Sequence, residues 1–201
     1  METPLNIMEL VCTRISHDLI GNIGALGNAV ELLEDGDDDF MPEIKAMLSL
    51  SSAVLNGRLK FFRMAFGRTN ANLENADTVS KICSDYIKTL NPHYPITLSL
   101  SPIDGQSSLN RALMLTVMVT ADIIIKGGNI TIKTDSKQIA AQVDSPAPLA
   151  QTKIDDIKNL LENGKFPPPE SLPQYAPIFV LREMGASLKV DTNNGFTMLI
   201  G

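Results

Sequence analysis

Residues 5–35 read LNIMELVCTRISHDLIGNIGALGNAVELLED, and apolar side chains recur along this stretch at steps of three or four. This spacing predicts one long amphipathic helix, because an α-helix turns about 100° per residue and gathers such positions into one stripe. The stripe includes Ile15, Leu19 and also Cys12, which we interpret as a small core residue. His17 falls about 200° around the helix from Ile15, nearly opposite the stripe, so we expect its side chain to face water.

A second long helix is expected to follow and to end near Phe66. Residues 34–39 interrupt the first pattern with one glycine and four aspartates, which predicts a turn. A calcium loop starting at Asp35 is the less favoured interpretation, because its twelfth position would be Ala46 and not glutamate. Two long helices joined by a short turn predict an antiparallel hairpin. The second helix also carries a second apolar stripe, which predicts a homodimer in which two hairpins form a four-helix bundle.

The remainder of the chain has the pattern of a mixed α/β unit. The polar run 69–75 is interpreted as a linker, which predicts one domain over residues 1–68 and a second over residues 76–201. The fold class is therefore α+β, with the helical hairpin followed by an α/β sandwich. The predicted helices span about 76–90, 107–125, 151–163 and 174–184, and the predicted strands span 96–100, 129–134, 138–144, 187–191 and 196–200.

The composition excludes several classes of function. The chain has 201 residues, of which 44% are hydrophobic, and its 17 basic and 23 acidic residues give a net charge of −6. This balance argues against nonspecific nucleic-acid binding, which depends on lysine and arginine contacts to phosphates. The longest apolar stretch, Ala112–Ile125, has 14 residues, whereas a membrane-spanning helix takes roughly 20. The first ten residues carry no basic residue, so no secretory signal is expected and the predicted location is the cytoplasm.

The residue types around His17 suit a phosphate carrier. Histidine is largely neutral at neutral pH, so one of its ring nitrogens has a lone pair that can attack a phosphoaspartate. Asp18 is adjacent and suited to holding the ring proton. Gly21 lies on the same helix face, where a small residue lets another protein approach closely. An ordinary surface histidine with incidental glycines is the alternative interpretation.

Basic residues are expected near the same level of the hairpin. If the turn is centred near residue 38, the residue opposite His17 is about residue 59, because both helices rise equally. Arg58 and Arg63 lie near that level, and Arg14 precedes His17 by one turn. Their positive charge would balance a phosphoryl group in transfer, although each is also explained as a solvated surface charge.

Several motifs in residues 12–67 resemble the ChpT family of bacterial histidine phosphotransferases. They are RISHDLIG at residues 14–21, Gly24-Ala25, ELLE at 31–34 and FRMAFG at 62–67. Asn22 departs from the family, which commonly has proline there. The resemblance implies a homodimer similar to sensor kinases, with an ATPase-like C-terminal domain. It also implies that His17 is phosphorylated, with Asp18 as its acid/base neighbour and Arg14 and Arg63 as contact residues.

The resemblance also implies partners and a missing cofactor. Phosphate would come from the receiver domain of a hybrid histidine kinase and pass to receiver domains of response regulators, with Mg²⁺ brought by the receiver. No ATP cofactor is expected, because Thr120 lies near the position of the magnesium-binding asparagine and Pro173–Pro177 replaces the glycine-rich segment. Two alternatives stay open: an atypical ATP-using histidine kinase, and a non-catalytic scaffold or inhibitor that binds receivers or kinases.

Overall fold

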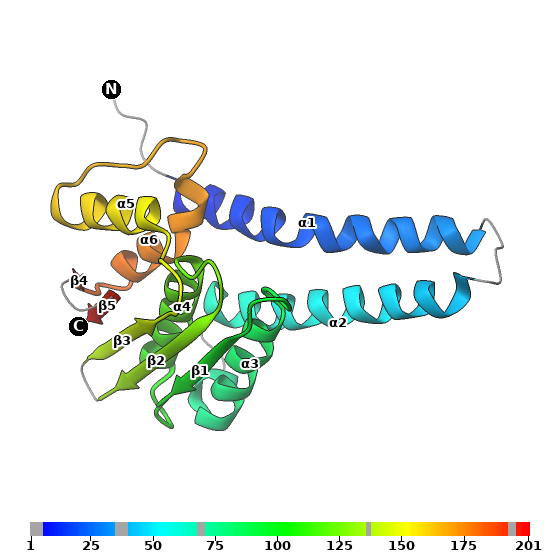
Figure 1. The fold of residues 1–201 in the computed structure, drawn as a ribbon. Coiled ribbons are helices and arrows are strands. Elements are labelled where there is room, and N and C mark those ends of the chain that lie inside the picture. The colour runs from blue at the N-terminus through cyan, green and yellow to red at the C-terminus, as the bar shows by residue number, and fades with distance from the viewer. Residues whose placement is uncertain (1–5, 35–39, 68–70, 136–137, 193–195) are drawn as a thin grey trace.

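The computed structural model describes residues 6–34, 40–67, 71–135, 138–192 and 196–201. Helices α1 (Ile7–Glu34) and α2 (Met41–Ala65) run side by side and project together from the rest of the molecule (Figure 1). The predicted helical hairpin is therefore confirmed, while the predicted acidic turn lies outside the described residues. The side chain of Asn6 caps α1 by accepting a hydrogen bond from the Glu9 backbone N–H at 3.3 Å.

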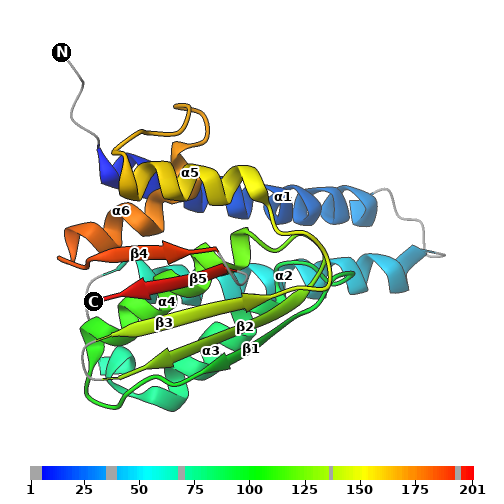
Figure 2. The same ribbon diagram turned by 60° about the vertical axis from the view of Figure 1, so that its left-hand side comes forward.

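The C-terminal part contains one five-stranded sheet, seen face-on in Figure 2. Its spatial order is β1-β2-β3-β5-β4, with β1 parallel to β2 and the other neighbours antiparallel. Apolar residues alternate along the strands, so that one face of the sheet is buried. The strands are β1 (Ile96–Leu100), β2 (Gly128–Thr134), β3 (Ile139–Asp144), β4 (Leu188–Asp191) and β5 (Phe196–Ile200).

Helices cover the buried face of this sheet. Helix α4 (Ser107–Asp122) is buried along nearly its whole length and packs on β2 and β3, while α3 (Ala76–Lys88) packs on β1. Helices α5 (Gln151–Glu162) and α6 (Ala176–Glu183) complete the unit, and α6 is preceded by the short 3-10 helix η3 (Leu172–Tyr175). These elements match the predicted ones to within a few residues.

The predicted linker is only partly irregular. Residues 71–74 form a second 3-10 helix, η2 (Ala71–Glu74), and Leu73 within it is fully buried. Leu73 also accepts a hydrogen bond through its carbonyl from the buried Asn110 amide at 2.8 Å. The burial of Leu73 was not predicted, because the segment is mostly polar and a single leucine gives no periodic signal.

The hairpin and the α/β unit share one hydrophobic core. Phe61 of α2 stacks on Tyr86 of α3 with ring centroids 3.9 Å apart, and Leu19 of α1 belongs to the same cluster. Arg111 of α4 donates a hydrogen bond to the carbonyl of Ala65 at 2.9 Å. These contacts fix the base of the hairpin against the α/β unit, so the position of α1 is set by both.

The α+β fold class is confirmed, with an N-terminal helical hairpin and a C-terminal α/β sandwich. Among the described residues, no helix combines the length and the apolar character that crossing a membrane requires.

Candidate phosphoacceptor site

His17 lies on the open face of α1, as its position opposite the apolar stripe predicted. Its side chain is 81% exposed, and its Nδ1 atom lies 3.2 Å from Oδ1 of Asp18. If Nδ1 carries the proton, it donates to the carboxylate and leaves the lone pair on Nε2, the nitrogen farther from the backbone. The pair therefore has the geometry to orient the ring and present one nitrogen as a nucleophile.

The surface of α1 next to His17 leaves space above the helix backbone. A Cβ atom added at Gly21 or Gly24 would meet no atom within 4 Å. Ile20, one turn from His17, is 65% exposed. Helix α1 continues without interruption through Asn22. A second protein can therefore approach the backbone of α1 closely beside His17.

Arg14 does not point toward solvent. Its guanidinium is buried, donates from Nε to Oδ2 of Asp18 at 2.8 Å and pairs through both Nη atoms with Asp122 at 2.7 and 3.0 Å. Burial by itself would lower the pKa of Arg14, but the two carboxylates outweigh burial and raise it. The predicted contact residue is thus held within the protein, and it touches Asp18 and not the open face beside His17.

Arg58 joins the hairpin to the α/β unit at the level of the site. Its Nη1 donates to the backbone carbonyl of Asp18, and its Nη2 donates to the backbone carbonyl of Thr89 at 2.9 Å. The prediction that Arg58 lies level with the His17 segment of α1 is therefore confirmed. Arg63 is exposed and lines a different groove, at the base of the hairpin where α1 begins and α2 ends. The predicted basic residues are therefore not assembled as one group around His17.

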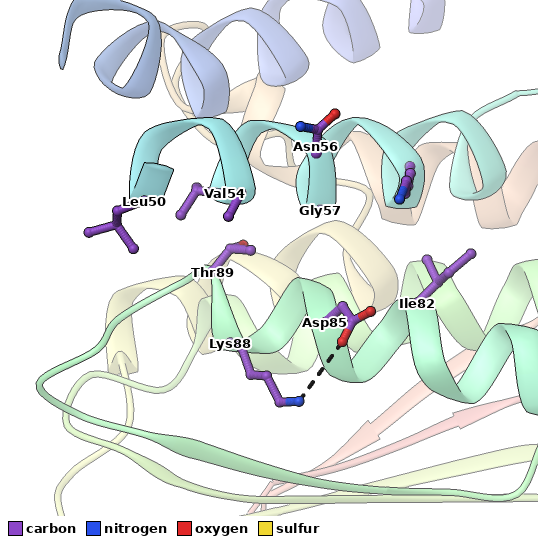
Figure 3. A pocket seen from close by; sticks show the side chains of 10 residues that line it. Leu50, Val54, Asn56, Gly57, Ile82, Asp85, Lys88 and Thr89 are labelled. Carbon is purple, nitrogen blue, oxygen red and sulfur yellow. Dashed lines mark ion pairs between the residues drawn. The ribbon is translucent and has the colours of Figure 1, made fainter. Parts of the chain in front are cut away.

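A groove of about 340 Å³ runs between α2 and the C-terminal end of α3 (Figure 3). Leu50, Val54 and Ile82 give it an apolar lining, and Asp85 and Lys88 form an ion pair at its edge. Thr89 lines one end of the groove, and Arg58 donates hydrogen bonds to the backbone carbonyls of both Thr89 and Asp18. The groove therefore begins beside the helix that carries His17.

A larger apolar groove, of about 590 Å³, lies at the base of the hairpin, where α1 begins and α2 ends beside the α/β unit. Cys12, which its place on the apolar stripe predicted to be a core residue, is exposed and lines this groove. Other apolar residues of the same stripe are also exposed, among them Met8 at 75% and Ile23 at 51%. The stripe is too wide for α2 to cover alone.

The region between α4 and η3, here called the α4/η3 region, includes part of Pro173–Pro177, the segment expected to replace the glycine-rich one. Its cavity measures about 10 Å³ and is lined by residues such as Asp122, Lys153 and Tyr175. The buried Tyr175 hydroxyl donates to Oδ2 of Asp156 at 2.7 Å, and Lys153 donates to the Asp122 carbonyl at 3.0 Å. Burial, and next the bond to Asp156, raises the pKa of Tyr175. Protein side chains therefore fill this region.

Sequence reasoning assigned no role to Asp122. It lies 108 residues from Arg14 along the chain, and an aspartate at the end of an apolar helix has an ordinary explanation as a solvated end. Neither periodicity nor spacing relates two residues so far apart, so no signal in one sequence could have paired them.

No family model matches the chain. The protein phosphotransferase ChpT of Brucella abortus (strain 2308) is 29% identical to it over 135 residues, which are 65% of this chain and 62% of that relative. The chain thus matches less than two thirds of the relative's length. A solved structure described as a bacterial phosphotransferase aligns with a TM-score of 0.75 and 19% identity, covering 100% of this chain and 98% of the other. The structure of the Acinetobacter baumannii histidine kinase AdeS aligns with a TM-score of 0.37 and 13% identity, covering 92% and 95%.

The fold therefore combines a helical hairpin that displays an exposed histidine with an adjoining α/β unit. The chain is ChpT-like: it is similar in sequence to the Brucella phosphotransferase, as the motifs in residues 12–67 predicted.

Proposed function

We propose that this protein is a histidine phosphotransferase that carries phosphate on His17 within a bacterial phosphorelay in the cytoplasm. Residues 1–68 form the dimerisation and phosphotransfer domain, and residues 76–201 form a degenerate ATPase-like domain. The observation that carries the proposal is the exposed His17 ring paired with Asp18 at 3.2 Å, on a helix face with open space at the neighbouring glycines.

The transfer step follows from that geometry. The Nε2 lone pair of His17 attacks the phosphorus of a phosphoaspartate on a receiver domain, forming a P–N bond as the P–O bond to the aspartate breaks. The aspartate leaves as a carboxylate with the bonding electrons. Asp18 holds the proton on Nδ1 throughout, which favours the positively charged ring of the phosphohistidine. The reverse step on a second receiver completes the relay.

The partners are receiver domains, one from a hybrid histidine kinase as donor and those of response regulators as acceptors. We assign them to the open face of α1 at Ile20 and Gly21, with the groove between α2 and α3 as a second contact on the α/β unit. Arg58 supports this surface from beneath, and Arg63 is an outlying partner contact. Mg²⁺ is supplied by the receiver domain.

ATP has no place in this proposal. The cavity of the α4/η3 region holds about 10 Å³, which is about the volume that one water molecule occupies. Tyr175 and Gln174 both line it, and both belong to the segment that replaces the glycine-rich one. In this proposal, phosphate reaches His17 from another protein.

The homodimer accounts for the exposed apolar stripe. Ile23 and Val30 on α1 are 51% and 47% exposed, and Leu59 on α2 is 50% exposed. A second hairpin packed on these side chains would remove them from water and complete a four-helix bundle. Ile23→Glu is expected to convert the dimer to monomer in size-exclusion chromatography with light scattering, whereas Glu31→Gln on the exposed side of α1 should leave the mass unchanged. A wild-type protein of monomeric mass would contradict the dimer.

The test uses a receiver domain of a hybrid kinase, phosphorylated with labelled acetyl phosphate and freed of excess reagent. We expect label on the wild-type protein and none on His17→Ala, followed by chase onto a response-regulator receiver. Label on wild type after incubation with ATP alone would favour the atypical kinase. Receiver binding without label on wild type would favour the scaffold or inhibitor.

A further inference from the structure

A series of charged groups, with the buried Arg14 at its centre, connects the α/β unit to His17. Asp122, the last residue of α4, accepts two hydrogen bonds from the Nη atoms of Arg14 at 2.7 and 3.0 Å. The Nε of Arg14 donates to Oδ2 of Asp18 at 2.8 Å, and the other carboxylate oxygen of Asp18 lies 3.2 Å from Nδ1 of His17. Each link is within hydrogen-bond distance, and the series ends on the reactive ring.

Arg14 and Asp18, which precede His17 in the series, are largely shielded from solvent. The side chain of Arg14 is 7% exposed and that of Asp18 is 15% exposed, whereas that of His17 is 81% exposed. A guanidinium is planar and its donors point in fixed directions, so pairing both Nη atoms with Asp122 also fixes the direction of Nε. The Asp18 carboxylate is thereby held in one orientation, with Oδ1 toward the histidine.

The anchor at Asp122 is itself held by the α4/η3 region. Lys153 of α5 donates to its backbone carbonyl at 3.0 Å, and the carbonyl of Gln174 accepts a hydrogen bond from Nη1 of Arg14 at 3.2 Å. Gln174 belongs to the segment that stands in place of the glycine-rich one. The filled region therefore contacts the phosphotransfer helix through Arg14.

We propose that Asp122 is a positioning residue for phosphotransfer, which acts through Arg14 and Asp18 to hold the His17 ring with its proton on Nδ1. The proposal rests on the proposed function for its kinetic consequence, but its effect on the ring does not depend on any partner. It gives the α/β unit a role at the histidine in the absence of nucleotide chemistry.

The backbone of Asp18 is held separately from its side chain. Arg58 donates to the Asp18 backbone carbonyl, so loss of Asp122 leaves that tether on α1 in place. A variant at Asp122 therefore changes the direction of the carboxylate without removing the link between α1 and α2. This separation allows a positioning role to be distinguished from a general loss of structure.

The experiment compares full-length wild type with Asp122→Asn, using the labelled receiver domain described above in single-turnover transfer. We expect the maximal rate to fall about tenfold while the receiver concentration at half-maximal rate stays within about twofold, because the variant affects the reacting ring and not docking. Asp122→Glu, which keeps the carboxylate, should recover part of the rate. A wild-type rate in a folded Asp122→Asn protein would overturn the proposal.

The ring itself gives a readout that a structural role would not move. Nitrogen-15 NMR of the imidazole should show Nδ1–H as the dominant form in wild type and a loss of that preference in Asp122→Asn. Asp156→Asn is the matched control, because it removes a partly buried carboxylate of the same region that bonds to Tyr175 and not to Arg14. An unchanged ring signature in Asp122→Asn, or an equal change in Asp156→Asn, would contradict the proposal.

A second variant covers loss of folding. If Asp122→Asn fails to fold, Arg14→Lys keeps the positive charge and loses the planar fork, and it should show the same fall in rate and the same change in the ring. A folded Arg14→Lys protein with the wild-type rate and ring signature would overturn the proposal. Absence of label on wild type would instead count against the proposed function, and the NMR comparison would still decide the role of Asp122.

Discussion

The histidine face of α1 and the α4/η3 region differ in the space that each leaves for a partner. The side chain of His17 is 81% exposed, and Gly21 beside it has open space where a Cβ atom would lie. In the α4/η3 region the buried Tyr175 leaves a cavity of about 10 Å³. One region is built to be approached from outside, and the other is built as a packed interior.

The proposed function accounts for this difference. Side chains of the α/β unit pack together and hold Arg14 against Asp122. In a phosphotransferase that receives its phosphoryl group from another protein, the histidine face would have to stay open. The following predictions test this contrast, beginning with the largest effect.

His17→Ala should lower phosphotransfer from a charged receiver by more than about a thousandfold, because it removes the nucleophile. The exposed side chain contributes little to packing, so the free energy of unfolding should change by no more than about 0.5 kcal/mol. Radiolabel transfer and urea denaturation measure the two quantities. Substantial label on His17→Ala would place the phosphoacceptor elsewhere.

Asp18→Asn should lower the rate of transfer about a hundredfold, because the amide cannot stabilise the positively charged ring as a carboxylate does. Receiver binding, measured by isothermal titration calorimetry, should stay within about threefold of wild type. The variant Asp155→Asn, at an exposed aspartate of α5 that accepts a hydrogen bond from Gln151, is a control for loss of one negative charge. Equal rates for the two variants would remove Asp18 from the mechanism.

Tyr175→Phe tests the packed region. It removes the hydroxyl that donates to Asp156 at 2.7 Å, and loss of such a bond to a charged acceptor should lower the free energy of unfolding by about 2 kcal/mol. Transfer to His17 should stay within about twofold, because the hydroxyl does not contact the histidine face. A large loss of transfer at unchanged stability would mean that the α4/η3 region takes part in the chemistry.

Gly21→Ala should increase the free energy of unfolding by about 1 kcal/mol, because alanine is more favourable than glycine in a helix interior. The added Cβ meets no atom of this chain, so any effect on transfer comes from the partner. We expect a larger residue, in Gly21→Gln, to raise the half-saturating receiver concentration without lowering the maximal rate. Asn28→Gln, at an exposed residue of α1 further from His17, is the control.

The sequence was sufficient for the elements whose signal is local. The apolar stripe of residues 5–35 gave α1 and the outward position of His17, and the strand Ile96–Leu100 was predicted with its observed bounds. The parallel pairing of β1 with β2 was not predicted, because strand partners depend on contacts across the chain. Leu73 and Cys12 were misjudged for the same reason, since neither one's burial follows from its neighbours in sequence.

Some features of the candidate site also follow from the local sequence, whereas others depend on tertiary packing. His17 and Asp18 are adjacent, so their pairing follows from the sequence, and the level of Arg58 follows from the equal rise of two helices. The direction of a long side chain does not follow from its position. Arg14 was expected to meet a phosphoryl group, and it lies buried against Asp122. Arg63, expected beside the histidine, lines another groove.

By itself the sequence determined the helical hairpin, the order of the elements in the α/β unit and a histidine directed to water. These depend on helix and strand periodicity, which acts over a few residues. Only the tertiary structure decided that the α4/η3 region is filled and that Asp122 reaches Arg14 across 108 residues. Those outcomes depend on how side chains from distant elements fill one interior, and no local pattern encodes that packing.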